Sequence, residues 1–546
     1  MAGGKAVNVF KFRMGDMPRE ALNWKFWLAV FCFGLLGAAR GVDEGLATGT
    51  FNSEAFQRHI GIADVSDVER ANLKGTISSM VQLGSIPGAL FAFIICDRVG
   101  RLWATRQLCV LWIVGIIIFM ANGGSLKAVY AGRFIAGVGI GETVVVGPVY
   151  LSEISPAPIR GLCTCAFTGA VYLGIMLAYF SVYGSEIHIP ESYNRWAVPT
   201  SVHLMFAGIL LILTLFQMES PRHLIRTEQR EKALKVLCRL RGLPADHWYV
   251  QREMMEMEVS YQEEKEATLG AGWVGILKEM FLIPNNSYRL LLTNMAQFMA
   301  CWSGGSAMTV YAPDLFEIVG VTGQKQALLS TAIFGVVKFI SAIICALFLV
   351  DYAGRKRSLV YGIILQLISM VYIAAFLLAV PVAHNPGFNP SASQQRASTA
   401  AIAAIYISGC GWALGWNSGQ YLLSSELFPL RIRAVGSSIT MAMHFANQYA
   451  VNRALPNMLL ETHGLTPSGT FWFFSAITVV GGVWVWLCVP EAAGRTLESI
   501  DKLFELPWYK IGLFGQKFAE EYDREQETQL DEKEKENAGA AHQEAA

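Results

Sequence analysis

Three ionisable side chains, Arg40, Asp43 and Glu44, lie within five positions at the end of an apolar stretch that contains "FWLAVFCF". A carboxylate in such a setting can take up and release a proton, and a guanidinium can bind an anion through two parallel hydrogen bonds. Charged groups inside a membrane-spanning segment are costly and by default mark a functional site. The helix that carries these side chains is therefore the first element to identify.

The composition indicates a membrane protein. The chain of 546 residues is 53% hydrophobic and 16% charged, whereas about a quarter of the residues of a soluble domain are charged. The formal net charge is zero, so nothing indicates a nucleic-acid partner. The chain has no P-loop, G-x-S-x-G or H-E-x-x-H motif, and we expect neither an enzyme nor a cofactor. Most of its ten cysteines lie in apolar runs without His partners, so we expect no disulfide framework and no metal site.

Apolar runs long enough to cross a bilayer recur along the chain. A span needs about 20 mostly apolar residues, and this rule gives about twelve candidates. They lie near 24–48, 75–96, 103–122, 128–150, 162–183, 196–218, 288–313, 326–350, 357–380, 399–424, 434–459 and 469–489. We expect a cytosolic N-terminus at 1–23, a six-helix half at 24–218, a cytosolic linker with amphipathic helices at 219–286, a second six-helix half at 287–489 and a cytosolic tail at 490–546.

Lysine and arginine are concentrated in alternate loops. The loops "DRVGR", "SPAPIR", "DYAGRKR" and "LFPLRIR" fall on one side of the membrane if the spans alternate, and opposite loops such as "NGGSLK" are poorer in cations. Cytoplasmic loops carry an excess of Lys and Arg. We therefore expect a multi-pass membrane protein with the basic loops, the linker and both termini in the cytoplasm. The location that we predict for it is the plasma membrane, although the loop charges give the orientation alone.

Short loop motifs repeat between the two halves. "DRVGR" after the second run returns as "DYAGR" after the eighth, and "SEISPAPIR" after the fourth returns as "SELFPLRIR" after the tenth. Gly100 and Gly354 permit a tight turn between two helices. We interpret the repeated acids and bases as a cytoplasmic gate that locks the halves together. The simpler alternative is that the arginines set the topology and reach lipid phosphates. The predicted gate residues are Asp97, Arg101, Glu153, Arg160, Asp351, Arg355, Glu426 and Arg433.

These motifs, together with "GRFIAGVGIG", "ESPR" and "PEAAGRTLESIDKLF", resemble the sugar porter family of the major facilitator superfamily from about residue 24 to 505. Two repeated six-helix halves are the architecture of that superfamily. The expected fold is an all-α membrane protein with twelve transmembrane helices. The wording "AARGVDEG" and the opening "MAGGKAVNVF" are similar to a fungal branch that is described as quinate or galacturonate permeases.

The resemblance implies a proton site between the first and fourth helices. Proton-coupled sugar porters carry an Asp in the first helix near an Arg in the fourth, and here those positions hold Asp43 and Arg133. Both fall in the outer half of the bilayer if the first helix runs outward and the fourth runs inward. We expect an external proton to neutralise Asp43 and release Arg133, which favours symport over passive uniport.

Two departures from the hexose members of the family indicate an acidic substrate. The first is the loss of side-chain amides, which suit sugar hydroxyls because an amide can donate and accept at once. The family positions for such amides hold Thr168 and Ile175 in the fifth helix and Ala300, Cys301 and Ser306 in the seventh. A substrate with fewer recognised hydroxyls fits this change.

The second departure is Arg40, because hexose members generally carry an apolar residue there. It either binds a substrate carboxylate or pairs with Asp43 or Glu44 on its own helix. We predict a proton-coupled symporter that imports an acidic monosaccharide or related hydroxy acid, D-galacturonate or quinate, by alternating access. The alternatives are a symporter for a neutral hexose, pentose or rhamnose, and a transporter-like nutrient receptor. The expected partners are this small molecule, protons and the lipid bilayer, and we expect the protein to function as a monomer. The predicted substrate-binding residues are Arg40, Glu142, Thr168, Ser306, Trp416, Asn417, Gln420, Tyr421, His444, Asn447 and Gln448, with Arg453 as a second candidate anion site.

Overall fold

The computed structural model describes most of the chain, and its regular elements within the described residues are all helices. The described residues are 18–156, 159–268, 273–345, 355–380, 391–460, 464–490, 503–504, 506–507, 510–515 and 518. The predictions for residues 1–17, for Asp351 and Gly354 and for most of the C-terminal tail lie outside them.

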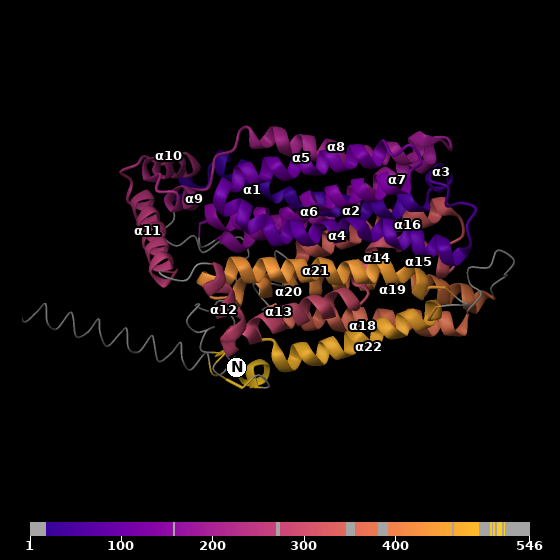
Figure 1. Cartoon of the computed structure of the whole chain (residues 1–546). Helices are drawn as coiled ribbons and strands as arrows, with labels where there is room; N and C mark the ends of the chain where they lie inside the picture. Colours follow the sequence, from indigo (N-terminus) through magenta and orange to yellow (C-terminus); the bar gives the residue numbers. More distant parts are fainter. Residues whose placement is uncertain are drawn as a thin grey trace, which may run out of the picture.

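The long helices form two layers, which we call the first and second halves (Figure 1). The first half consists of α1 (Trp24–Gly34), α2 (Leu36–Asn52), α3 (Glu54–His59), α4 (Asp67–Val99), α5 (Arg101–Met120), α6 (Leu126–Ile154), α7 (Arg160–His188) and α8 (Tyr193–Thr214), preceded by the short η1 (Arg19–Ala21). The second half consists of α13 (Pro284–Trp302), α14 (Gly305–Val310), α15 (Ala312–Ile318), α16 (Gln324–Ile344), α18 (Arg355–Ala379), α19 (Ala392–Leu414), α20 (Trp416–Glu426), α21 (Leu430–Met458) and α22 (Thr466–Cys488).

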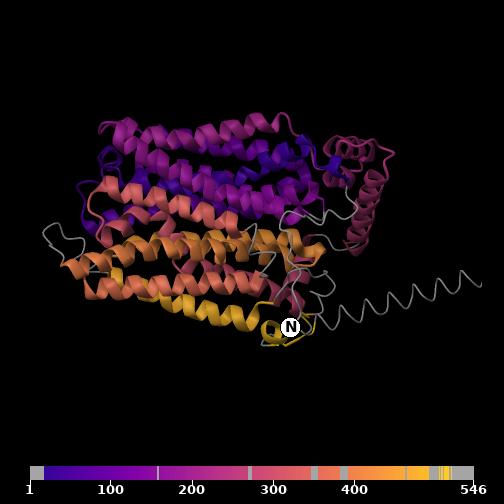
Figure 2. The same cartoon turned by 180° about the vertical axis from the view of Figure 1, so that it is seen from behind.

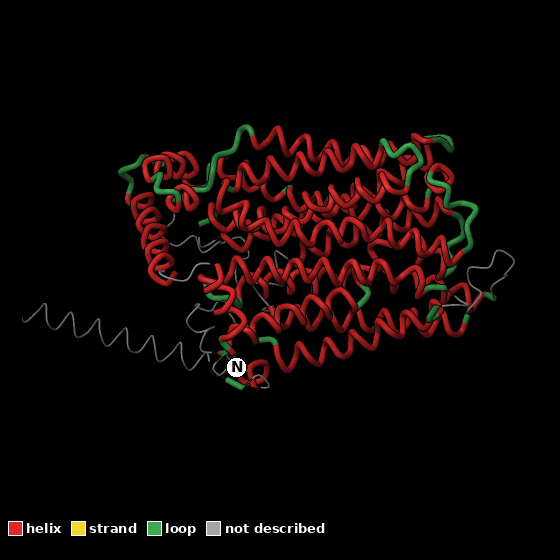
Figure 3. Tube along the Cα trace, in the orientation of Figure 1, coloured by secondary structure: helices red, strands yellow, loops and turns green. Residues whose placement is uncertain are grey.

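Four helices connect the halves at one end of the molecule. They are α9 (Pro221–Arg226), α10 (Arg230–Arg241), α11 (Trp248–Thr268) and α12 (Trp273–Leu282). We call this the linker end and the opposite one the far end; Figure 3 shows that the loops gather at these two ends. Gly242 follows α10 in the left-handed conformation, with φ of 67°, and stops that helix.

Ten described helical segments are long and apolar enough to cross a membrane. The predicted run at 288–313 is broken into α13, α14 and α15, and it falls outside this group because α13, the longest of the three, is rich in polar residues. The Gln366 side chain of α18 is buried and donates to the Ser303 carbonyl at 2.9 Å, which satisfies one backbone group at the first break. The predicted run at 434–459 forms α21, a single helix of 29 residues. Its arginines, amides and histidine lower its mean hydropathy.

The two halves meet along paired helices. Helix α4 packs along α21, and α7 packs along α16; Figure 2 shows the same two layers from behind. Within the first half α2 lies close against α7, where a Cβ on Gly41 would be 1.9 Å from the Val171 carbonyl oxygen. Helix α2 also contacts α14 of the second half. This packing places the charged residues of α2 between the halves.

Candidate functional site

Asp43 and Arg133 form a buried ion pair between α2 and α6. Arg133 Nη1 donates to Asp43 Oδ1 at 2.6 Å, and the two side chains are 3% and 2% exposed. The guanidinium carbon lies 5.3 Å from the centre of the Phe51 ring and 5.9 Å from that of Phe119. Nε and Nη2 of Arg133 have no hydrogen-bond partner among the described residues. Protonation of Asp43 would leave the Arg133 cation without its anionic partner. Because the pair has little access to water, an unpaired Arg133 would be costly in free energy.

Arg40 and Glu44 form a second buried ion pair one helical turn along α2. Arg40 Nε donates to Glu44 Oε1 at 2.9 Å. The structure thus gives Arg40 a partner on its own helix, and that partner is Glu44. The Arg40 guanidinium also extends toward α21, where Nη2 lies 2.9 Å from His444 Nε2 and 3.4 Å from Gln448 Oε1. Arg40 therefore links the two halves.

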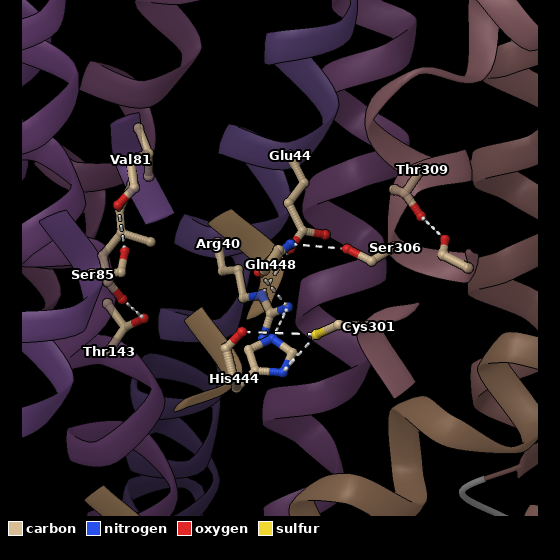
Figure 4. A network of polar contacts seen from close by, with 12 residues as sticks. Arg40, Glu44, Val81, Ser85, Thr143, Cys301, Ser306, Thr309, His444 and Gln448 are labelled. Atoms are coloured by element: carbon tan, nitrogen blue, oxygen red, sulfur yellow. Dashed lines mark hydrogen bonds and ion pairs between the residues drawn. The ribbon is translucent and has the colours of Figure 1, made fainter. Parts of the chain in front are cut away.

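The second half surrounds this pair with neutral polar groups, shown in Figure 4. Gln448 Nε2 donates to Glu44 Oε1 at 2.9 Å and to Ser306 Oγ of α14 at 3.2 Å. His444 Nδ1 lies 2.9 Å from Gln297 Oε1 of α13. Because Arg40 can only donate to Nε2, the hydrogen of this imidazole is on Nδ1 and points at Gln297. We call Arg40, Glu44, Gln297, Ser306, His444 and Gln448 the central cluster.

Three other predicted substrate residues, Asn417, Gln420 and Asn447, are buried in the second half. Gln420 on α20 is 1% exposed, and neither its amide nitrogen nor its amide oxygen has a partner among the described residues, although its backbone carbonyl accepts from Gln297 Nε2 at 3.3 Å. Asn447 accepts from Trp302 Nε1 at 3.2 Å. Asn417 is buried on the same helix as Gln420. Buried amide groups without partners are rare in proteins and need an explanation such as a ligand.

Three predicted residues bond or pack away from the central cluster. Thr168 Oγ1 donates to the Cys165 carbonyl of its own helix at 3.0 Å. Glu142 Oε1 accepts from Gln107 Nε2 of α5 at 3.1 Å. Trp416 is fully buried, and its ring lies against Gly481. Ligand contacts by these three stay a prediction, as does one by Tyr421, whose side chain lies outside the described residues.

Sequence reasoning missed two buried polar residues here. Gln297 lies one turn before Ala300, so α13 keeps a side-chain amide even though the family positions for amides hold other residues. Lys338, in the middle of α16, is 1% exposed and donates from Nζ to Thr309 Oγ1 at 2.5 Å. Both lie inside predicted apolar runs, so their polarity within such a run was the signal that could have found them.

A charged cluster at the linker end contains several predicted gate residues. Arg101 Nη2 lies 2.8 Å from Glu153 Oε1 and 3.2 Å from Asp97 Oδ1. The Glu219 carboxylate accepts from the backbone N–H of Arg101 at 3.0 Å and of Leu102 at 3.1 Å. An anion at the first turn of α5 satisfies amides that have no partner within the helix.

The turn before α5 depends on glycine. Gly100 has a φ of 96°, which fits the predicted tight turn. A Cβ at this position would be 2.4 Å from Glu219 Oε2, so a larger residue would also clash with that carboxylate. In the second half, Arg433 donates to the Phe428 carbonyl at 3.1 Å through Nε and Nη2. The side chains of Arg160, Arg355 and Glu426 lie outside the described residues, and gating by this set stays a prediction.

His223 of α9 completes the cluster at the linker end. Its Nδ1 lies 2.9 Å from Arg101 Nη1. Burial and the nearby Arg101 guanidinium lower the pKa of His223 below its ordinary value of 6.5, against the opposing attraction of Glu219, Glu153 and Asp97. The neutral imidazole is therefore the form that accepts the arginine hydrogen bond.

A cavity of about 810 Å³ lies at the far end, away from the central cluster. Both halves line it, including Asp67 and Lys74 of α4 and Asp314 and Glu317 of α15. Nearby, Asn72 Oδ1 accepts from Arg453 Nη1 at 3.2 Å. Arg453, the second candidate anion site, thus bonds across the halves at this end.

Two packed helical halves, with buried ion pairs of the first half at their interface and a hydrogen-bonded arginine that links them, are the architecture of a secondary membrane transporter. Residues 29–504 match the family described as "Sugar (and other) transporter". The chain belongs to this family.

Relatives agree with this assignment, and a solved structure has the same fold. The chain is 29% identical over 490 residues to a protein named "Probable quinate permease" from Aspergillus niger, with 89% of each chain covered. It is 29% identical over 492 residues to the "Quinate permease" of Emericella nidulans, covering 89% of this chain and 90% of that one. The proton:xylose symporter XylE, bound to 6-bromo-6-deoxy-D-glucose, superposes with a TM-score of 0.72 at 22% identity, over 88% of this chain and 99% of XylE.

These comparisons confirm three predictions. The resemblance to sugar porters and to quinate permeases is confirmed. The major facilitator fold with twelve transmembrane helices is confirmed. The family and its relatives are membrane transporters, so the expectation that the chain is not an enzyme is confirmed as well.

Proposed function

We propose that the protein is a proton-coupled symporter that imports quinate, D-galacturonate or a related cyclic hydroxy acid by alternating access. The observation that carries the proposal is Arg40, a buried cation that reaches from α2 to His444 and Gln448 of α21. A substrate carboxylate must leave water to bind, which is costly unless a fixed cation meets it. The guanidinium fork matches a carboxylate with two hydrogen bonds.

Glu44 occupies the place that a substrate carboxylate would take. Its carboxylate is already held by Arg40 Nε and by Gln448 Nε2, both at 2.9 Å. An incoming anion would share or replace these contacts, and Arg40 and Gln448 lie in opposite halves of the protein. Substrate binding would therefore change the bonding between the halves, as alternating access requires. The names of the quinate permeases support this substrate class.

Proton coupling rests on the pair of Asp43 and Arg133 at 2.6 Å. An external proton on Asp43 would free Arg133, and loss of that proton inside would restore the pair. The name of XylE as a proton:xylose symporter supports this role. The same proposal includes four further predictions. They are the gate, the cytoplasmic position of the linker end, the plasma-membrane location and the monomeric state.

A neutral monosaccharide is the second candidate substrate, and the observation that favours it is Gln420. Both polar atoms of its buried amide have no partner among the described residues, and an amide suits a sugar hydroxyl. Uptake by a host without its own sugar and acid transporters separates the two candidates. Quinate, galacturonate, glucose, xylose and rhamnose are compared at two external pH values. We expect uptake of an acid that rises as the external pH falls; uptake of neutral sugars alone would refute the acid proposal.

A further inference from the structure

A buried lysine near the central cluster has no role in the mechanism described so far. Lys338 lies in the middle of α16, and its stem packs closely on α19, where a Cβ on Gly409 would be 3.2 Å from Lys338 Cγ. Its ammonium lies 5.3 Å from the centre of the Tyr172 ring and 5.2 Å from that of Phe334. The Lys338 ammonium has three N–H donors. Among the described residues, its acceptor is the hydroxyl of Thr309, at 2.5 Å.

The position of Lys338 connects it to the central cluster. Thr309 and Ser306 lie three positions apart on α14, so their side chains are neighbours on one helix face. Ser306 accepts from Gln448, which also bonds Glu44. The Lys338 ammonium is close enough to Glu44 for attraction and to Arg40 for repulsion.

The charges of this region do not balance. Asp43 and Arg133 neutralise each other at 2.6 Å. Arg40 and Lys338 are two cations, and Glu44 is the carboxylate that attracts both of them. The charges of these five residues sum to plus one. A buried cation is expensive unless an anion compensates it, and in a membrane protein such a residue is by default functional.

We propose that Lys338 is a specificity-determining residue that, together with Arg40, holds the single carboxylate of the substrate and selects acids over neutral sugars. The inference deepens the proposed function and rests on it. A monoanion between Arg40 on α2 and Lys338 on α16 brings the region to neutrality, and Glu44 is released from one of its cations as the anion binds. The hydroxyls of the same ligand are left for the amide of Gln420, whose two polar atoms have no partner among the described residues.

The test compares an acid with its uncharged counterpart on purified protein. The probes are quinate and quinamide, which differ in the charged group alone, and binding is measured by calorimetry on wild type, Lys338→Met, Lys338→Arg and Lys325→Met. Lys325 is the matched control, because it is an exposed lysine on the same helix. We expect Lys338→Met to lower quinate affinity roughly 10- to 100-fold, the range for a hydrogen bond to a charged group, and to leave quinamide affinity unchanged. Lys338→Arg keeps part of the quinate affinity, and Lys325→Met matches wild type.

A charge-restoring variant separates charge from shape. Glu44→Gln combined with Lys338→Met again leaves one excess positive charge, and it should recover part of the quinate affinity that Lys338→Met loses. Thr309→Val keeps the lysine but removes its acceptor, so it tests the site if Lys338→Met does not fold, and it should weaken quinate binding alone. Equal loss of quinate and quinamide, or wild-type quinate affinity in Lys338→Met, overturns the role of Lys338. Failure of the wild type to bind any acid refutes the proposed function itself.

Discussion

At the scale of single residues, Asp43 is the group whose proton would drive transport. Asp43→Asn cannot carry the charge that holds Arg133, so the variant should lose accumulation against a gradient and keep downhill exchange. Accumulation of labelled quinate in proteoliposomes with an inward proton gradient measures this. Asp67→Asn is the control, because the side chain of Asp67 is 86% exposed at the start of α4. Full pH-driven accumulation by Asp43→Asn would exclude the proton role.

Arg40 carries the second residue-scale prediction. Removal of one partner of a buried ion pair typically costs about 3–5 kcal/mol, so Arg40→Met should cut acid uptake by orders of magnitude while the protein remains in the membrane. Arg40→Lys should restore part of the uptake, since a lysine lacks the two-pronged fork. Arg58→Met serves as control, because Arg58 is 64% exposed in its pairs with Glu54 and Glu191. Acid uptake at wild-type affinity by Arg40→Met would return Arg40 to a structural pair with Glu44.

The contact of Asp43 with Arg133 was predictable from the sequence, because the resemblance places both residues and the helix directions place them at one depth. The contact of Arg40 with His444 was not. Its partners lie more than 400 positions away in the chain, at 2.9 Å in space, and no periodicity encodes that distance. Lys338 was equally hidden, since a lone cation in an apolar run does not indicate which helix supplies its acceptor.

At the scale of elements, hydropathy predicted long apolar runs but not the breaks inside three of them, at 24–48, 288–313 and 399–424. At the break between α13 and α14, Gln366 of α18 donates to the Ser303 carbonyl, which lies 63 positions earlier in the chain. Helix α21 is polar because its side chains form contacts between the halves. Its mean hydropathy is therefore low for a helix of its length. The turn at Gly100 was predictable from its residue type, whereas its support by Glu219 required the folded chain.

The cluster around α9 should respond to pH through His223. Its pKa in the folded protein is lowered, so between that value and the ordinary 6.5 the unfolded chain binds more protons than the folded one. Stability therefore falls as the pH drops through this window. We expect His223→Gln, which keeps a neutral acceptor for Arg101, to lose less thermal stability than wild type between pH 7.5 and a pH about two units lower.

Thermal unfolding in detergent at the two pH values measures this difference. His188→Gln is the control, because that histidine is exposed at the far end and bonds the Gly184 carbonyl of its own helix. It should show the acid sensitivity of wild type. An equal loss of stability in His223→Gln and wild type would show that another group dominates the acid response.

At the scale of the whole molecule, hydrogen bonds between the halves gather at two levels. One is the central cluster, with Tyr179 Oη donating to the Thr309 carbonyl at 2.5 Å beside it. The other is the far end, where Asn52 Nδ2 donates to Asp314 Oδ1 at 3.0 Å. The charged cluster at the linker end lies within the first half and α9. The polar contacts of the far end thus join α2 to α15 and α4 to α21, beside the cavity that both halves line.

Asn72 is the residue on which the far-end contact can be tested. Its Oδ1 accepts from Arg453 Nη1 at 3.2 Å and from Asn457 Nδ2 at 3.0 Å, both on α21. Asn72→Ala removes both bonds, worth together about 1–3 kcal/mol, and should shift the protein toward a state that is open at the far end. Hydrogen–deuterium exchange should then rise at residues 67–79 and 451–458, at the facing ends of α4 and α21.

Gln57→Ala is the matched control, because the Gln57 amide bonds the Phe51 carbonyl within the first half, and it should leave the exchange of α21 unchanged. Unchanged exchange in Asn72→Ala would mean that the apolar contact of α4 with α21 closes this end, and that the alternation between states is governed by the central cluster and the linker end instead.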